Sequence, residues 1–257
     1  LVGGAGSDVI YAGYGDFADG GANGPVGDFL YLSLAGAGSG VTATVSMATS
    51  VVGGGTISNF EYIARVDGSA FADSINVGQT NNFGYAVNGG AGDDTLVAGY
   101  NAAVLHGDDG NDVIDVRGAV GSGSVYGDAG NDYFFDLWNV HLIGGGGQAA
   151  IDGGSEADVA TIDFGDRSAS VVVSLQAENF VTYYSVGGIT QLGSVTHVEN
   201  IKLYGGSAGD YFAGNSGDDD LLGRGGNDTL IGAGGVDLLD GGDGGDSISG
   251  GAGADLL

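Results

Sequence analysis

Large apolar residues recur at every ninth position in the C-terminal part of the chain. From Gly205 onward the sequence reads GGSAGDYFA, GNSGDDDLL, GRGGNDTLI, GAGGVDLLD, GGDGGDSIS and GGAGADLL. The eighth residue of each unit is large and apolar, at Phe212, Leu221, Leu230, Leu239, Ile248 and Leu257. A short strand with one inward side chain cannot bury that side chain alone. The pattern therefore predicts that the units stack and that their apolar residues form a ladder.

Two other positions of the nine-residue unit are invariant. The first residue is always glycine, at Gly205, Gly214, Gly223, Gly232, Gly241 and Gly250. The sixth residue is always aspartate, at Asp210, Asp219, Asp228, Asp237, Asp246 and Asp255. Glycine lets a turn bend sharply and expose its carbonyl groups, and Ca²⁺ prefers carbonyl and carboxylate oxygens as ligands. Each unit is therefore expected to pair an oxygen-rich turn with a strand.

These units resemble the calcium-binding nonapeptide repeats of the RTX (repeats-in-toxin) family, whose pattern is G-G-x-G-x-D-x-U-x with U apolar. The resemblance implies an all-β fold, a right-handed parallel β-roll or β-solenoid. In such a roll the first six residues of a unit form a turn and the last three a strand. Two units complete one coil, and Ca²⁺ lies between turns two units apart. Asp210, Asp228 and Asp246 would then form one row, and Asp219, Asp237 and Asp255 a second.

The middle of the chain carries a weaker copy of the pattern. GGAGDDTLV, GDDGNDVID and GDAGNDYFF supply Asp94, Asp112 and Asp132 at the sixth position. The intervening segments AGYNAAVLH and VRGAVGSGSVY supply Ala103 and no acid at the matching place. We therefore expect calcium along one edge of a central roll and none along the other.

Other units are less regular. GGGGQAAID has Ala149 at its sixth position, so the occupied row is expected to end there. GGSEADVAT recovers Asp158 but has Glu156 in place of the fourth glycine, and Asp73 is a further candidate in DGSAFADSI. At the N-terminus GGAGSDVIY supplies Asp8, and the next segment breaks the pattern. Asp8 is expected to make half a site, with its neighbour upstream.

Two longer segments separate the repeat blocks and echo each other. One contains DFLYLS, VTATVS, GTISNFEYI and DGSAFADSI, and the other contains DVATID, SVVVSL, GSVTHVENI and GGSAGDYF. Alternation over 41–45 and the β-branched run 171–173 predict strands. The chain is thus divided into degenerate repeats at 1–27, a β-rich insert at 28–88, a central roll at 89–161, a second insert at 162–204 and a C-terminal roll at 205–257.

Charge strengthens the expectation of a bound cation. The 257 residues include 57 glycines, and 33 acidic residues against five Lys and Arg give a net charge of −28. So few cations argue against a nucleic-acid partner or an anionic membrane surface. With 42% hydrophobic residues the chain is too apolar for a solvated acidic tail. Several Ca²⁺ ions would let the carboxylates crowd around a core and would couple metal binding to folding.

The remaining signals are mostly negative. The chain has no cysteine, hence no disulfide or thiolate site. It has no apolar run long enough to span a bilayer and no signal-peptide pattern, and it is expected to be a piece of a longer polypeptide.

No nucleophile elbow, phosphate loop or paired histidine motif occurs in the sequence, so no catalytic residue is expected and the chain is not expected to be an enzyme. His106, His141 and His197 are expected to be surface or strand residues. Trp138, beside an irregular unit, is expected to cap a core, with a sugar or partner contact as the alternative.

Three functional hypotheses remain. The first is a calcium-dependent structural segment of a secreted bacterial surface protein, such as an adhesin, surface-layer component or filament. Resemblance to the family implies type I secretion and folding outside the cell. The second is an accessory RTX module of a secreted enzyme or toxin whose active region lies elsewhere, and the third is a carbohydrate-binding module. The exposed ends of a solenoid also favour self-association, end to end or in a lattice.

Overall fold

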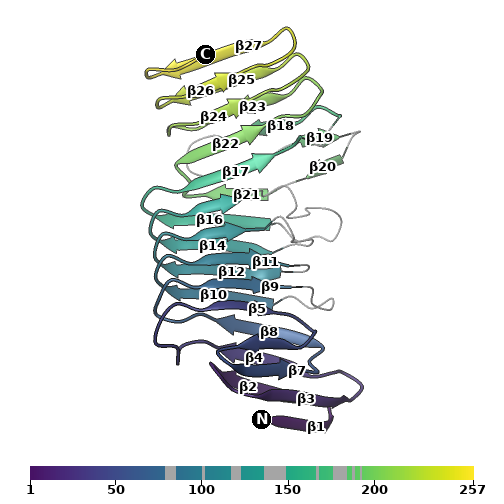
Figure 1. Ribbon diagram of the computed structural model, residues 1–257. Helices are drawn as coiled ribbons and strands as arrows, with labels where there is room; N and C mark the ends of the chain where they lie inside the picture. Colours follow the sequence, from purple (N-terminus) through teal and green to yellow (C-terminus); the bar gives the residue numbers. More distant parts are fainter. Residues whose placement is uncertain are drawn as a thin grey trace.

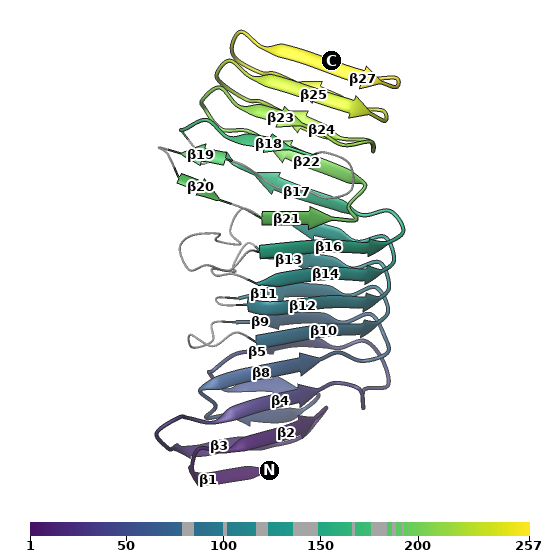
Figure 2. The same ribbon diagram turned by 180° about the vertical axis from the view of Figure 1, so that it is seen from behind.

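The strands of the computed structural model stack into one long column (Figures 1 and 2). The structure describes residues 1–78, 85–99, 102–116, 123–135, 149–165, 168–175, 184–186, 189–191 and 193–257. Within these ranges the chain forms strands β1 to β27 and no helix. The all-β, parallel architecture expected from the repeats is therefore confirmed.

Two large parallel sheets form the two faces of the column. Sheet I has the order β2 (Val9–Gly13), β4 (Phe29–Ser33), β8 (Tyr62–Asp67), β10 (Tyr85–Ala91), β12 (Ala102–Asp109), β14 (Ser124–Ala129), β16 (Ala149–Ser155), β21 (Gly193–Thr196). Sheet II has the order β5 (Thr42–Val45), β9 (Ser74–Val77), β11 (Thr95–Ala98), β13 (Val113–Asp115), β15 (Tyr133–Phe135), β17 (Val159–Asp163), β22 (Asn200–Tyr204), β24 (Asp220–Leu222), β26 (Leu238–Asp240).

Smaller sheets complete the two faces. Sheet III contains β1 (Val2–Gly6), β3 (Ala18–Asn23), β7 (Gly55–Ser58) and β6 (Ser50–Val52). Sheet IV contains β18 (Val172–Ser174), β23 (Tyr211–Ala213), β25 (Thr229–Gly234) and β27 (Ser247–Ala252). A separate antiparallel pair joins β19 (Tyr184–Val186) to β20 (Ile189–Gln191).

The core is a set of apolar ladders between the two faces. Along sheet II, Leu96 pairs with Ile114 and Ile114 with Phe134, so that equivalent residues of successive coils lie side by side. All three side chains are fully buried. The inward residue of each short strand thus packs against its copies above and below, as the period predicted.

Each insert interrupts one face of the column and leaves the other intact. In the first insert sheet III ends at β6 and β7 and sheet II begins at β5, while sheet I continues through β4, β8 and β10. In the second insert sheet I ends at β21 and sheet IV begins at β18, while sheet II continues through β17, β22 and β24. The two segments that echo each other in sequence therefore add coils in the same way, on opposite faces.

The strands predicted at 41–45 and 171–173 are present as β5 and β18, each beginning one residue later than predicted. Within the described ranges no helix is long and apolar enough to cross a membrane. Trp138 and His141 lie outside the described residues.

The ladder predicts which leucines stabilise the column. Leu230 is fully buried and pairs with Phe212 and Ile248, whereas Leu238 is 44% exposed. Leu230→Ala should lower the free energy of unfolding in saturating calcium by about 2–5 kcal/mol, because it leaves a cavity. The matched surface variant Leu238→Ala should change it by less than about 1 kcal/mol. Urea unfolding measures both, and equal losses would contradict the ladder.

Candidate metal centres

The turn aspartates form two rows that run along the column. In row one the backbone N–H of each aspartate donates to Oδ1 of the aspartate one coil further on, at 2.7–2.8 Å from Asp73 through Asp94, Asp112 and Asp132 to Asp158. The row continues from Asp219 to Asp237 and Asp255, at 2.9 and 3.1 Å. These aspartates precede the strands of sheet II, so one edge of the central roll carries a continuous line of carboxylates.

Row two lies at the turns that lead into sheets I and IV. Asp210 N–H donates to Asp228 Oδ1 at 2.6 Å and Asp228 N–H to Asp246 Oδ1 at 2.9 Å. The two C-terminal series therefore separate into the two rows expected from pairing every second unit. The other edge of the central roll lies largely in segments outside the described residues, which include 79–84, 100–101, 117–122 and 136–148.

Two expectations about the rows are corrected. The row of aspartates does not end near Ala149, because Ala149 begins strand β16 of sheet I and Asp132 bonds directly to Asp158. The number of residues between successive aspartates of row one increases from 18 (Asp94 to Asp112) to 20 (Asp112 to Asp132) and 26 (Asp132 to Asp158). Counting in units of nine therefore no longer places the aspartates correctly. Ala103 likewise lies within strand β12 rather than at a turn.

The neighbour of Asp8 is the second correction. Asp8 N–H donates to Asp28 Oδ1 at 2.8 Å, so the partner lies downstream in the chain. Its turn, GGANGPVGD, is three residues longer than the repeat turn, which concealed it from a nine-residue count. The signal that could have found it is the Gly-Gly start together with Phe-Leu after the aspartate.

Two glutamates continue the rows where the inserts lack a repeat turn. Asp28 N–H donates to Glu61 Oε2, and Asp158 N–H donates to Glu199 Oε2, both at 2.9 Å. The sequence reasoning missed both, although NFEYI and HVENI occupy matching places in the two inserts.

In most of the turns that end in an aspartate of row one or row two, the second carboxylate oxygen of that aspartate, Oδ2, has no hydrogen-bond donor. Within the described part of the chain, the unpartnered buried side-chain oxygens are Oδ2 of Asp8, Asp28, Asp94, Asp112, Asp132, Asp158, Asp228 and Asp237. We call the turns of these eight residues the open turns. An unpartnered buried acceptor costs about 1–3 kcal/mol, and more when it is charged. Eight such atoms in equivalent places indicate a ligand-binding role.

The first glycine of each open turn shows what surrounds this oxygen. A methyl group on Gly107 would overlap Asp112 Oδ2 and the carbonyl oxygen of Gly127 in the next coil. Gly89 and Gly127 make the same approach to their own aspartates. Two acceptors, a carboxylate oxygen and a carbonyl oxygen, thus lie near each other without a donor between them. A hard cation such as Ca²⁺ fits this donor set, because it takes six to eight oxygen ligands.

The backbone of the open turns is left-handed at the second residue. Gly90 and Gly154 have φ of 105° and 107°, and Asp108, Asp128 and Ala233 occupy the same position with φ of 69°, 72° and 81°. Such values cost a non-glycine residue roughly 1–2 kcal/mol. In the six-residue open turns the fourth residue has positive φ too, even where Glu156 replaces glycine, with φ of 76°. The turn geometry is therefore retained where the consensus glycines are lost.

Comparison with known protein families identifies the repeat to which most of the open turns belong. A model of the RTX calcium-binding nonapeptide repeat matches four segments, residues 1–16, 88–122, 204–239 and 231–257. The chain carries RTX repeats. No curated protein matches the chain. The matched segments include Asp8, Asp94 and Asp112 but not Asp28 or Asp158. Asp28 and Asp158 nevertheless have the same unpartnered Oδ2 and the same bond between coils, so turns of this kind also occur outside the matched segments.

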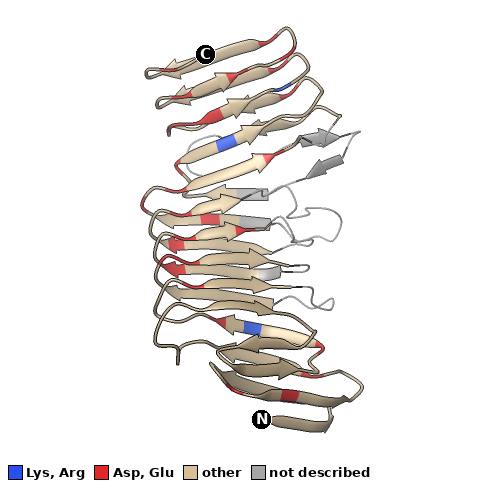
Figure 3. Cartoon of the chain, in the orientation of Figure 1, with Lys and Arg blue, Asp and Glu red and all other residues tan. Residues whose placement is uncertain are grey.

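The carboxyl groups of the RTX turns titrate far from their ordinary range. Burial raises the pKa of Asp94, Asp112 and Asp219 to about 7 and the pKa of Asp132 and Asp158 to about 6. Neighbouring carboxylates add to the increase in each case. Figure 3 shows acidic residues along the whole column and very few cations to offset them. At neutral pH the turns of Asp94, Asp112, Asp132 and Asp158, whose second carboxylate oxygen has no donor, therefore require either protons or a bound cation.

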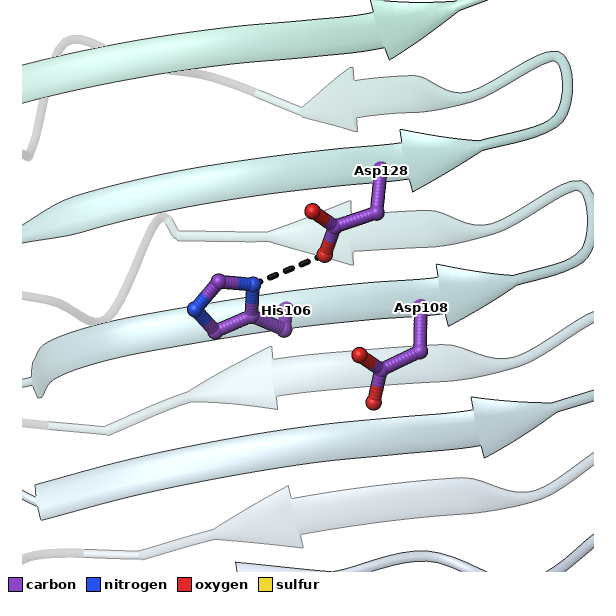
Figure 4. Close-up of side chains that lie close together, drawn as sticks. All are labelled: His106, Asp108 and Asp128. Carbon is purple, nitrogen blue, oxygen red and sulfur yellow. Dashed lines mark hydrogen bonds and ion pairs between the residues drawn. The ribbon is translucent and has the colours of Figure 1, made fainter.

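A separate cluster lies on the outside of the central RTX turns. The side chains of His106, Asp108 and Asp128 bring ligand-type atoms within 4.8 Å of one another, and His106 Nδ1 lies 2.7 Å from Asp128 Oδ2 (Figure 4). His106 also stacks on Tyr126. Each of the three is partly exposed, so the cluster lacks the buried, unpartnered oxygens of the open turns. His106 lies in a strand and His197 is exposed, as expected for surface or strand residues.

The glycine contacts predict the effect of a single methyl group. Gly107→Ala should reduce the free energy of unfolding in calcium by about 1–3 kcal/mol, because the methyl group displaces Asp112 Oδ2 and the Gly127 carbonyl. Gly38→Ala is the control, since a methyl group there meets nothing within 4 Å. Denaturant titration measures the difference, and equal effects would contradict the proposed packing around the oxygen.

The raised pKa values predict that protonation of the turn aspartates stabilises the folded chain when no metal is bound. Unfolded aspartates have a pKa near 3.9, so with Asp94, Asp112, Asp132 and Asp158 at about 6–7 the folded chain binds more protons between these values. Stability without calcium should thus be present at low pH and lost as pH rises through 6–7. In chelator, circular dichroism should show more β-structure at pH 5 than at pH 8. An Asp94→Asn/Asp112→Asn variant should show a weaker pH dependence, and an unchanged dependence would argue against these groups.

Proposed function

We propose that the chain is a calcium-binding structural segment of a secreted bacterial RTX protein that folds when it binds extracellular Ca²⁺. The observation that carries the proposal is the series of eight buried Oδ2 atoms without donors. At about 1–3 kcal/mol each, their combined cost is of the same order as the usual net stability of a domain, about 5–15 kcal/mol. A cation in each turn would remove this cost.

Repulsion between neighbouring carboxylates supports the same mechanism. Two unit charges about 4 Å apart repel by roughly 4 kcal/mol at an effective dielectric constant of about 20. In low cytosolic calcium the rows would favour the unfolded chain, which suits export through a type I system. In millimolar calcium outside the cell, binding to the folded state alone would shift the equilibrium towards the column.

Within this reading we favour a surface protein of the adhesin, surface-layer or filament type. Two inserts that add coils while keeping one face continuous build length and rigidity, which a spacer at a cell surface requires. The alternative is an accessory RTX module of a secreted enzyme or toxin whose active region lies outside this chain. We propose no catalytic role for the chain itself in either case.

Self-association in calcium belongs to the same proposal. Large apolar side chains are exposed on the outside of the column, including Val51, Phe71, Val236 and Leu238. Association of such surfaces between neighbouring columns in a lattice would bury them.

A calcium titration followed by far-UV circular dichroism tests the proposal. The chain should gain β-structure steeply with Ca²⁺ and far less with Mg²⁺, which keeps its own waters and tolerates fewer protein oxygens. Asp112→Asn should raise the calcium concentration at the midpoint, because it weakens an oxygen cluster in row one. Asp109→Asn is the matched control, since that side chain is exposed three residues earlier. A wild-type chain fully folded in chelator at pH 8 would refute calcium-triggered folding.

A further inference from the structure

Three aspartate turns differ from the open turns in the state of the second carboxylate oxygen. They are residues 68–73, 205–210 and 214–219, which we call the closed turns. In each, Oδ2 accepts a hydrogen bond from the N–H of the second residue of the same turn. The pairs are Ser69 to Asp73 at 2.5 Å, Gly206 to Asp210 at 2.9 Å and Asn215 to Asp219 at 2.7 Å. None of these oxygens is unpartnered.

The backbone explains the difference. The second residue of an open turn has positive φ, as in Gly90, Asp108 and Ala233. Ser69, Gly206 and Asn215 do not have positive φ, so their N–H groups face the carboxylate. The positive end of an N–H dipole thus reaches the oxygen that has no donor in the open turns.

Side chains reinforce two of the closed turns. Ser69 Oγ donates to Asp73 Oδ1 at 3.0 Å. Asn215 Oδ1 accepts the N–H of Gly217 at 2.7 Å, and Asn215 Nδ2 donates to the carbonyl of Val198 at 3.1 Å. Serine and asparagine stabilise turns through such local bonds. These sequences therefore favour a turn that is complete without a metal.

The closed turns share one place in the column. Each holds the first aspartate of a run in its row, and its Oδ1 accepts an N–H from a coil that belongs to an insert and has no aspartate there. The donors are Val41 for Asp73, Val171 for Asp210 and Ile201 for Asp219, at 2.6–2.8 Å. The next aspartate in every case belongs to an open turn: Asp94, Asp228 and Asp237 respectively.

We infer that the three closed turns bind no calcium and are metal-independent starting turns on which the calcium-binding turns of each block stack. The inference rests on the proposed function and deepens it, because it assigns an order to folding. It also revises the role expected for Asp210 and Asp219, which the repeat pattern alone groups with the calcium ligands. Calcium sites would then form from each insert towards the C-terminal end of its block.

A matched pair of variants tests the assignment. Asp219 and Asp237 lie one coil apart in row one, are 2% and 1% exposed, and each accepts a backbone N–H through Oδ1. Asp237→Asn should lower the number of calcium ions bound per chain by at least one at saturating calcium, and Asp219→Asn should leave the number unchanged. Equilibrium dialysis with metal analysis gives the count. An equal loss in both variants would overturn the inference.

Hydrogen exchange on the wild-type chain provides a second readout that does not depend on a variant folding. In chelator, the amides of Ser69, Gly206 and Asn215 should exchange more slowly than those of Arg224 and Ala233, because only the first three bond to a carboxylate. Equal exchange would overturn the inference. A wild-type chain that binds no calcium would instead refute the proposed function. The inference would then fail as well, because no turn would bind calcium.

Discussion

The second oxygen of the turn aspartate is the atom around which each RTX coil is built. Its partner oxygen joins one coil to the next through a backbone N–H, while Oδ2 lies buried over the first glycine of its own turn. That position excludes a side chain from Gly107 and its equivalents and sets the carboxylate beside a carbonyl of the following coil. Glycine at the first position and aspartate at the sixth thus have one common cause, and the proposed dependence on calcium follows from the same geometry.

The inserts relieve this constraint in a systematic way. Where a row passes through an insert, Glu61 or Glu199 accepts the N–H that an aspartate would otherwise accept. Where the row resumes, a closed turn satisfies its own carboxylate with an N–H donor. The same fold therefore contains turns whose second carboxylate oxygen has a donor and turns in which it has none, and a few side chains and φ angles separate them.

Much of this could be predicted from the sequence, because the nine-residue period of Gly, Asp and an apolar residue encodes a coil directly. The two C-terminal rows and the line from Asp94 to Asp132 follow from counting alone. Counting fails where the chain between two coils is longer, as before Asp158 and at Asp28, because a solenoid tolerates extra residues in a turn without losing its ladder. It also cannot separate Asp219 from Asp237, since the decisive difference is the direction of one backbone N–H.

The two inserts break opposite faces of the column, and this has a mechanical consequence. Sheet I runs unbroken from β2 to β21 and sheet II from β5 to β26, so each discontinuity is spanned by an intact sheet on the other face. A tensile load applied along the column would therefore always cross a continuous ladder of backbone hydrogen bonds. The inserts would lengthen the molecule without introducing a plane at which it could be pulled apart by separating apolar surfaces alone.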